Sequence, residues 1–182
     1  MDYKKQLHER LDARKEKLIS FIDRLHRMVD AGQLGGESGR IWLDQYAIGV
    51  GVNLCCGDFS VGNSLGIDND PEKIAIDIWG LADHYYNDMP PLDFVVTNYL
   101  ECFPDPLGVL KNWNKKLKPG GIFAVVACNT DMYANPAGPL ANPRRLNCFS
   151  TLTLKAYFQA AGFKVEKVDL EDKELRIMGR KV

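Results

Sequence analysis

The sequence predicts a doubly wound α/β domain whose sheet is mostly parallel and ends in an antiparallel hairpin. After residue 39, short apolar runs rich in Val and Ile alternate with helix-compatible stretches, a pattern typical of strands buried on both faces of a parallel sheet. Near the C-terminus, two longer segments flank the polar turn 171–173 and predict the hairpin. The length of 182 residues and the 46% content of hydrophobic residues fit one globular domain.

Five apolar runs predict the parallel strands. They occupy residues 46–54, 64–67, 73–76, 94–97 and 122–127. The other predicted elements are helices over residues 105–117 and 153–161 and hairpin strands over residues 164–170 and 174–181. The first of these helices places Leu110, Trp113 and Leu117 on one face, and the Lys-Pro-Gly-Gly sequence at 118–121 is expected to end it.

The first 39 residues form a separate segment. Apolar residues recur at helical spacing along residues 1–31, at Leu7, Leu11, Leu18, Ile22, Leu25 and Val29. This spacing predicts one amphipathic helix, and the glycines that follow it predict a flexible joint. We therefore divide the chain into an N-terminal helix with its joint, 1–39, and a domain, 40–182. The apolar stripe of the helix either packs on the domain, forms a homodimer contact or acts as a lid, and the sequence leaves these alternatives open.

Charge and composition exclude several classes of function. The 23 Lys and Arg residues nearly balance the 24 Asp and Glu residues, so bulk electrostatics do not favour nucleic acid as a partner. The longest apolar run, 122–128, has seven residues, whereas a membrane-spanning helix needs about 20. The five cysteines form no Cys-x-x-Cys pair, which argues against a disulfide framework or a zinc site. We expect a cytoplasmic protein that needs no metal, with no signal peptide and no membrane association.

Polar residues follow the predicted strands, where an open α/β sheet binds its ligands. Segment 53–58 follows the first strand, Asp68 and Asn69 the second, Asp77 and Ile78 the third, and segment 98–100 the fourth. Acids at the ends of the first three strands suit a ligand with ribose hydroxyls and an amino group, and they suit a phosphate poorly. A dinucleotide site is also excluded, because Leu54 stands where Gly49-x-Gly51 would require a third glycine.

Six short motifs, in order and at plausible spacing, resemble those of the class I S-adenosylmethionine-dependent methyltransferases. They occupy residues 52–58, 65–68, 75–78, 93–101, 117–123 and 160–163. The first is similar to the glycine-rich motif of the family in a variant with the pattern Asn-Leu-x-Cys-Gly, and the fifth matches its Leu-Lys-Pro-Gly-Gly turn. The resemblance covers residues 44–182. It implies a Rossmann-like sheet of the seven-stranded type, S-adenosylmethionine as cofactor, and methyl transfer as the reaction.

The resemblance also implies which residues hold the cofactor. They are Asn53, Leu54, Cys55, Cys56, Gly57, Asp58, Asp68, Asn69, Asp77, Ile78, Asn98, Tyr99 and Leu100. By this resemblance Asp68 accepts hydrogen bonds from the ribose hydroxyls, and Asp77 accepts one from the adenine amino group. We nominate no catalytic residue, because the sulfonium already activates the methyl group and the protein mainly supplies proximity and orientation.

Three departures from the family pattern leave a second interpretation open. Cys55 replaces the first glycine of the glycine-rich motif, and Phe59 replaces the last. Only ten residues separate Gly57 from Asp68, so the helix that normally joins the first two strands is vestigial or absent. The alternative to a methyltransferase is a non-catalytic protein of the same fold that binds a ligand or dimerises through its N-terminal helix.

The sequence does not identify the methyl acceptor. Residues 129–150 lack periodicity, and a stretch of this length predicts a loop that binds the acceptor. Arg144 and Arg145 are candidates for an anionic acceptor, the alternative being solvated surface arginines. Tyr99 and Glu101 lie where the transferred methyl is expected, unless Glu101 instead ties the following loop. The expected partner is a small-molecule or polymer-attached acceptor, with nucleic acid and membrane disfavoured.

Overall fold

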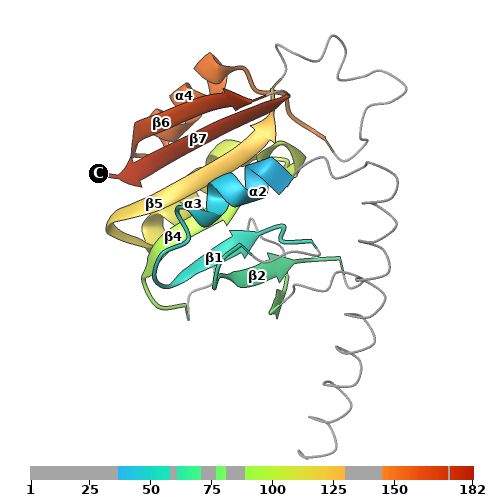
Figure 1. Cartoon of the computed structure of the whole chain (residues 1–182). Coiled ribbons are helices and arrows are strands. Elements are labelled where there is room, and N and C mark those ends of the chain that lie inside the picture. The colour runs from blue at the N-terminus through green and yellow to red at the C-terminus, as the bar shows by residue number, and fades with distance from the viewer. Residues whose placement is uncertain (1–36, 58–60, 71–76, 81–88, 130–144, 172) are drawn as a thin grey trace, which may run out of the picture.

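The computed structural model of the chain describes residues 37–57, 61–70, 77–80, 89–129, 145–171 and 173–182. Within these ranges, seven strands form one sheet in the order β3-β2-β1-β4-β5-β7-β6 (Figure 1). The strands are β1 (Gly51–Leu54), β2 (Leu65–Asp68), β3 (Ile78–Trp79), β4 (Leu92–Thr97), β5 (Leu117–Cys128), β6 (Phe163–Glu171) and β7 (Glu174–Lys181). β1 to β5 run parallel, and β7 lies antiparallel to both β5 and β6. The predicted fold class is therefore confirmed.

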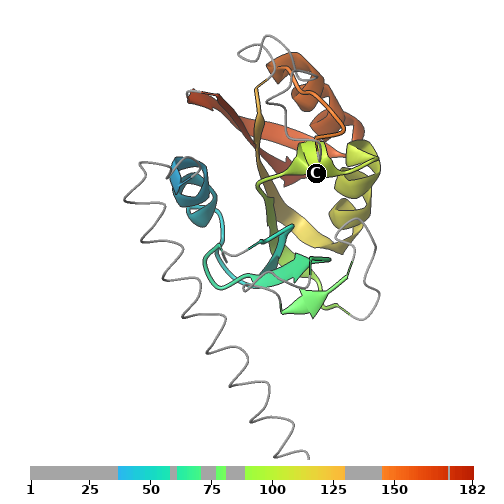
Figure 2. The same ribbon diagram turned by 90° about the vertical axis from the view of Figure 1, so that its right-hand side faces the viewer.

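Helices cover the sheet on both faces (Figure 2). α2 (Glu37–Asp44) lies on one face, whereas α3 (Pro106–Lys116) and α4 (Thr151–Ala160) lie on the other. A short 3₁₀ helix, η1 (Leu100–Cys102), follows β4. No helix in the described ranges combines the length and the apolar character needed to cross a membrane. The predicted helix over residues 1–31 lies outside the described residues.

Side-chain caps explain where α3 and α4 begin. The Asp105 carboxylate accepts a hydrogen bond from the Gly108 N–H at 2.9 Å, and Pro106 occupies the first turn, where a missing N–H costs nothing. The Ser150 hydroxyl accepts a hydrogen bond from the Thr153 N–H at 3.2 Å. Both helices thus begin where a side chain satisfies a free backbone N–H. Both predicted helices are confirmed, with shifts of one or two residues at their ends.

The larger hydrophobic core lies between the sheet and the helices α3 and α4. Trp113 of α3 and Phe158 of α4 are fully buried in it. The Phe123 ring lies 6.0 Å from the Phe158 ring and 5.8 Å from the Phe163 ring, both in edge-to-face contact. A Cβ atom at Gly179 would lie 2.6 Å from Phe158, so only glycine lets this ring approach β7. Because each such ring contributes about 1.5–3 kcal/mol by burial, this cluster fixes α4 on the sheet.

The helix α2 covers a second, smaller core on the opposite face. Trp42 and Leu43 of α2 are buried there. The sheet contributes the apolar side chains Phe94, Val96, Ala124, Val126 and Met178. The Trp42 Nε1–H also donates a hydrogen bond to Asp169 Oδ2 at 2.8 Å. This single side chain therefore joins α2 to the sheet interior and to the hairpin.

A buried arginine fastens the first turn of α2 to the hairpin. Arg176 of β7 is only 4% exposed, and its guanidinium pairs with Glu171 and with Glu174. It also donates to Ser38 Oγ at 2.7 Å. A buried guanidinium is tolerated because its donors are paired in this way. Residues 37–39, predicted as part of the joint, are instead the first residues of α2, so the predicted domain boundary falls inside this helix.

The first strand is shorter than the apolar run 46–54 predicts. β1 begins at Gly51. Gly49 has a φ of +97°, which interrupts an extended backbone and is accessible mainly to glycine. The Val50 N–H then donates to the side chain of Asp93 at 2.8 Å instead of pairing with a strand. Residues 46–50 therefore form a turn before the strand, in which Ile48 and Val50 are exposed, and that part of the prediction is wrong.

The third strand differs in its position. The predicted run 73–76 lies outside the described residues, and β3 is Ile78–Trp79. Asp77 therefore precedes the strand, although we predicted that it follows one. The Asp77 N–H donates to the Gly66 carbonyl, and the Asp77 carboxylate accepts from the Gly66 N–H, both at 2.9 Å. Asp77 thus extends the pairing of β3 with β2 at the amino end of β3.

The remaining strands match their predictions more closely. β2, β6 and β7 lie within one residue of the predicted bounds. β5 begins at Leu117, directly after α3, and not at residue 122. The Lys-Pro-Gly-Gly sequence at 118–121 therefore lies within β5, where the register with β4 shifts between Leu92 and Phe94. It ends the helix as predicted, and the chain enters the strand at once.

We predict that Trp42→Ala lowers the free energy of unfolding by about 3–5 kcal/mol, because it removes a large buried ring and leaves a cavity. Trp42→Phe keeps most of the ring but loses the bond to Asp169, and we expect a loss of about 1–2 kcal/mol. Chemical denaturation of the full chain, followed by circular dichroism, measures both. A Trp42→Ala protein as stable as the wild type would show that α2 does not belong to the folded body.

Candidate functional site

Strand register brings three polar strand ends to one edge of the sheet. Leu54, the last residue of β1, pairs with Ile67 of β2 and with Thr97 of β4. The next residues on these three strands therefore lie at one level: Cys55, Asp68 and Asn98. This edge is formed by the carboxyl ends of parallel strands, where α/β domains bind their ligands. The structure thus brings together three of the predicted site residues.

The turn after β1 is held against the end of β2 by hydrogen bonds. The Gly57 N–H donates to Asp68 Oδ2 at 2.9 Å, and the Cys56 N–H donates to the Ile67 carbonyl at 3.3 Å. The other carboxylate oxygen, Asp68 Oδ1, accepts from the Asp70 N–H at 3.0 Å. Asp68 is 8% exposed, and these charge-assisted bonds offset the cost of burying its carboxylate.

The backbone of this turn requires two left-handed residues. Gly57 has a φ of +60° and Cys55 a φ of +52°. Within the described ranges, Cys55 is the one residue other than glycine with a positive φ. For an L-residue this conformation costs about 1–2 kcal/mol, so glycine is favoured where the family motif has it. Cys55 nevertheless adopts the conformation that a glycine would adopt, and the path of the turn is kept.

The space above Gly57 is open. A Cβ atom built on Gly57 meets no atom of the described residues within 4 Å. The glycine is therefore required by its backbone conformation and leaves room for another molecule to approach the turn. Asp68 lies directly beside this space, because its carboxylate accepts the Gly57 N–H.

A threonine ties the end of β4 to the end of β1. The buried Thr97 Oγ1–H donates to the Leu54 carbonyl at 3.0 Å and accepts from the Tyr99 N–H at 3.4 Å. These bonds fix the path of the chain as it leaves β4 and the position of the Tyr99 backbone. The sequence analysis did not single out Thr97, and only its place as the one hydroxyl residue in the apolar run 94–97 signals it.

Tyr99 projects from this edge. Its side chain is 43% exposed. Partial burial, together with the nearby carboxylate of Glu101, raises the pKa of its phenol. The phenol is therefore neutral near pH 7 and can donate or accept a hydrogen bond. Tyr99 therefore lies exposed just after the end of β4, and its contact with a ligand remains a prediction.

Glu101 ties the connection that follows β5. It is 2% exposed, and its Oε1 atom accepts from the Cys128 N–H at 3.3 Å and lies 3.6 Å from Arg145 Nε. Its carbonyl accepts from the N–H groups of Leu146 and Asn147. Burial raises the pKa of its carboxyl group. Of the two interpretations, the contacts favour the tie, and Arg145 faces this carboxylate.

Cys56 is a packing residue and not a nucleophile. Burial, with the charges of Asp68 and Asp77, raises the pKa of its thiol to about 12. A thiol with this pKa stays protonated at neutral pH and does not attack an electrophile. Within the described ranges, no three His, Cys, Asp or Glu side chains gather so that they could hold a metal ion.

The other predicted cofactor residues are more dispersed. Those with interior side chains are Asn53, Leu54 and Leu100. Ile78 is half-buried and packs against the larger core, whereas Asn69 is exposed directly after Asp68. Asp77 lies level with Gly66, two residues before the end of β2. Asp58 lies outside the described residues.

A separate groove of about 520 Å³ lies between α2 and the hairpin. Its lining includes Ile41, Trp42 and Leu170, and none of the predicted cofactor residues. The groove and the strand-end edge are thus different features, and only the edge combines an acid, a glycine turn and an exposed tyrosine.

A family model described as a methyltransferase domain matches residues 3–168. The chain belongs to this methyltransferase domain family. S-adenosylmethionine is accordingly its cofactor. No curated protein matches the sequence.

Solved structures share the fold of this chain at low sequence identity. A methyltransferase of Thermotoga maritima, described as a possible histamine N-methyltransferase, is 16% identical with a TM-score of 0.69, over 92% of this chain and 99% of that chain. The YcgJ protein of Bacillus subtilis is 13% identical with a TM-score of 0.65, over 80% and 98%. A putative methyltransferase of Haloferax volcanii, in complex with the Trm112 activator, is 18% identical with a TM-score of 0.60, over 72% and 81%. These identities show the fold alone.

We predict that Cys55→Gly is more stable than Cys55→Ala by about 1 kcal/mol. At an ordinary helix or strand position alanine is the more stable residue by about 0.5–1 kcal/mol, but a left-handed backbone reverses this order. Urea denaturation of both variants measures the difference. An alanine variant that equals or exceeds the glycine variant would show that residue 55 does not hold a positive φ.

We predict that Glu101→Gln makes stability less dependent on pH. Because burial raises the pKa of Glu101 in the folded state, the native protein binds this proton more tightly than the unfolded chain. The contribution of Glu101 to the free energy of unfolding is therefore fully present below its unfolded pKa of about 4.3. It is lost as the pH rises through the folded pKa. Glutamine does not ionise, so the variant should gain stability relative to the wild type between acidic and neutral pH.

Urea denaturation across this pH range tests the Glu101 prediction, with Glu166→Gln as the control. The Arg180 guanidinium lowers the pKa of Glu166 in the folded state. The contribution of Glu166 to the free energy of unfolding is therefore present above its unfolded pKa and is lost as the pH falls. The control should therefore shift in the opposite direction. Parallel curves for Glu101→Gln and the wild type would show that Glu101 ionises without cost.

Proposed function

We propose that this methyltransferase binds S-adenosylmethionine over the turn after β1 and transfers its methyl group to an acceptor at the end of β4. One observation carries the proposal: the Asp68 carboxylate lies beside the Gly57 N–H, on the edge shared by β1, β2 and β4. An acid next to an open glycine turn fits a ligand that presents hydroxyls beside an extended amino-acid part.

Asp68 is suited to hold the two ribose hydroxyls. Each oxygen of a carboxylate offers about two acceptor positions. One position on each oxygen is used, by the N–H groups of Gly57 and Asp70. The second position on each oxygen remains for a hydroxyl, so ligand binding need not break the bonds that shape the turn. The same N–H groups fix the direction in which the carboxylate points.

The turn itself is suited to the methionine part. No atom of the described residues lies within 4 Å of where a Cβ of Gly57 would be, and a backbone without a side chain can approach a ligand closely. Cys55 keeps a φ of +52°, so the exchange of glycine for cysteine preserves the backbone. Both points support a working cofactor site over the non-catalytic alternative.

The residues of the β4 end would position the acceptor. S-adenosylmethionine supplies a methyl group that is already activated by its sulfonium. Tyr99 is half exposed there and neutral, so it orients an acceptor by hydrogen bonding and does not act as a base near pH 7. Thr97 fixes the backbone from which Tyr99 projects. An acceptor that is already nucleophilic needs only this placement.

The acceptor in this proposal is a small molecule or a group attached to a polymer. The hypothesis that Arg145 binds an anionic acceptor is weakened, because its Nε atom faces Glu101 at 3.6 Å. Arg144, the other candidate, lies outside the described residues. The predicted contact of Asp77 with the adenine amino group is not part of the proposal, since Asp77 precedes β3.

We predict that Asp68→Asn weakens binding of S-adenosylhomocysteine by about 1.5–3 kcal/mol, through loss of charge-assisted bonds to the ribose. Asparagine keeps the size of the side chain and one acceptor oxygen, so the fold should persist. Isothermal titration calorimetry measures the affinity. The control Asp77→Asn, also an acid bonded to a backbone N–H, should bind nearly as the wild type does.

Three results would contradict this assignment. Equal affinity of Asp68→Asn and the wild type would remove Asp68 from the ribose site. A comparable loss in Asp77→Asn would show that Asp77 contacts the cofactor after all. A wild-type protein that binds neither S-adenosylmethionine nor S-adenosylhomocysteine would favour the non-catalytic alternative.

A further inference from the structure

The balanced net charge conceals a strong segregation of charge along the chain. Residues 106–165 contain eight Lys and Arg residues and a single acid, Asp131. The rest of the chain holds the other 15 basic residues against 23 acids. An asymmetry of this size between two parts of one chain indicates a charged interaction surface and is not visible in the net charge of −1.

The fold gathers this basic segment on one side of the molecule. The described residues of this segment form α3, β5, α4 and the start of β6, and both helices cover the same face of the sheet. Neither helix contains an acid, and the one charged residue of α4 is Lys155. The charged groups that these two helices place at the surface are therefore all positive.

Some of the basic residues of this segment have structural roles. Lys116 is buried and donates to the Met89 carbonyl at 3.0 Å. Lys118 pairs with Asp93 at 2.6 Å. Because these two cations are engaged within the fold, they do not define a binding surface.

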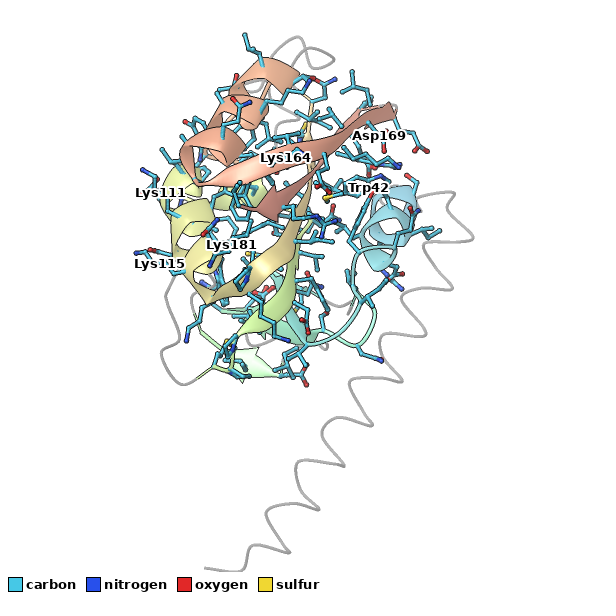
Figure 3. The ribbon with its side chains drawn as sticks, turned by 90° about the vertical axis from the view of Figure 1, so that its left-hand side faces the viewer. Trp42, Lys111, Lys115, Lys164, Asp169 and Lys181 are labelled. Atoms are coloured by element: carbon cyan, nitrogen blue, oxygen red, sulfur yellow. The ribbon has the colours of Figure 1, made fainter. Side chains whose placement is uncertain are left out.

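Four other lysines form what we term the lysine face: Lys111 and Lys115 of α3, Lys164 of β6 and Lys181 of β7. All four are presented on the side of the molecule shown in Figure 3. Their elements meet at one corner, because the Asn114 side chain donates to the Gly162 carbonyl just before β6. No salt bridge joins any of the four to a carboxylate of the described residues.

The contacts of the lysine face are to neutral oxygens. Lys115 Nζ lies 3.4 Å from the amide oxygen of Asn112. Lys181 Nζ donates to the carbonyls of Asn114 and Leu117 at 2.6 and 2.7 Å, so it already caps the C-terminal end of α3. Among the described residues, Lys111, Lys115 and Lys181 pair with no carboxylate. Lys164 differs, because it lies close enough to Glu166 to lower the pKa of that carboxyl group.

Helix stability does not account for this arrangement. Lys111 and Lys115 are four residues apart on one helix, a spacing at which like charges repel. A cation near the C-terminal end of a helix is favourable, but Lys181 and Lys116 already place positive charge at that end of α3. Lys164 lies opposite another cation, Arg180, across the strands, and the Glu166 carboxylate beside both offsets part of their repulsion. An anionic partner would remove these costs.

We propose that the lysine face binds the phosphate backbone of nucleic acid without regard to sequence. Lysine is a compact point charge that suits single phosphates, and the face contains no arginine fork for a base edge. The aromatic ring of α3, Trp113, is buried and cannot stack on bases. The surface comprises residues of α3, β6 and β7 and does not include Asp68 or Gly57, so this docking is separate from methyl transfer.

Fluorescence anisotropy on the full chain tests the proposal, with a labelled DNA duplex of about 20 base pairs and an RNA of about 20 nucleotides as probes. The test variant is Lys111→Gln with Lys115→Gln. The matched control is Lys167→Gln with Lys173→Gln, which removes the same charge from the hairpin. Salt titration from about 50 mM gives the number of phosphates that are neutralised.

We expect saturable binding of both probes at low salt and a linear fall of log affinity with log salt concentration. The test variant should bind about tenfold more weakly or worse, and its salt slope on the duplex should be smaller by about 2, since each phosphate contact contributes about 0.9. The control variant should bind within about threefold of the wild type.

Three outcomes would overturn the proposal. First, the wild type shows no saturable binding of either probe at low salt. Second, the test and control variants lose affinity equally. Third, the protein binds vesicles that contain phosphatidylserine and binds neither oligonucleotide. The last outcome would assign the lysine face to an anionic membrane surface. Circular dichroism of both variants confirms that each remains folded.

Discussion

The bond between the Gly57 N–H and the Asp68 carboxylate is the constraint on which the candidate site depends. It joins the turn after β1 to the end of β2 across a connection of only ten intervening residues. A carboxylate this well buried is stable only if its oxygens accept hydrogen bonds, and the backbone of the turn supplies one of them. The shape of the turn and the placement of the acid therefore enforce each other, and neither can shift alone.

The short connection between β1 and β2 affects the rest of that face of the sheet. Its described residues contain no helix, so α2, which precedes β1, provides the described helical cover there. Trp42 fills the smaller core and binds Asp169, and Arg176 binds the first turn of α2. Polar bonds to the hairpin thus hold a helix of eight residues, which is too short to be stable by itself.

Local patterns predicted the elements that local physics determines. The α3 helix has a capping acid, a proline in its first turn and apolar residues at helical spacing, and all three signals are local. By contrast, the start of β1 depends on the positive φ of Gly49, and β3 is a strand of two residues without a pattern of its own. No sequence window contains the reason for Gly179, which is the Phe158 ring from another element.

The same limit applies to the site. The strand-end rule placed Asp68 and Asn98 correctly, because register carries adjacent strand ends to one level. It misplaced Asp77, because the bounds of β3 were wrong, and it missed Thr97, whose bonds join two strands that are far apart in the sequence. A residue that contacts a ligand leaves a signal in a motif, whereas a residue that positions such a contact is found only in the folded chain.

The distribution of charge separates two surfaces with opposite preferences. The strand-end edge carries Asp68 and Asp70, and this negative field favours a cationic sulfonium and disfavours phosphates. The lysine face, formed by residues of α3, β6 and β7, has the reverse preference (Figure 3). A polyanion drawn to the lysines is therefore repelled from the cofactor edge, and the two ligands need not compete. The charges of the basic segment 106–165 and of the more acidic rest of the chain nearly cancel in the sum. The net charge therefore argues neither for nor against an anionic partner.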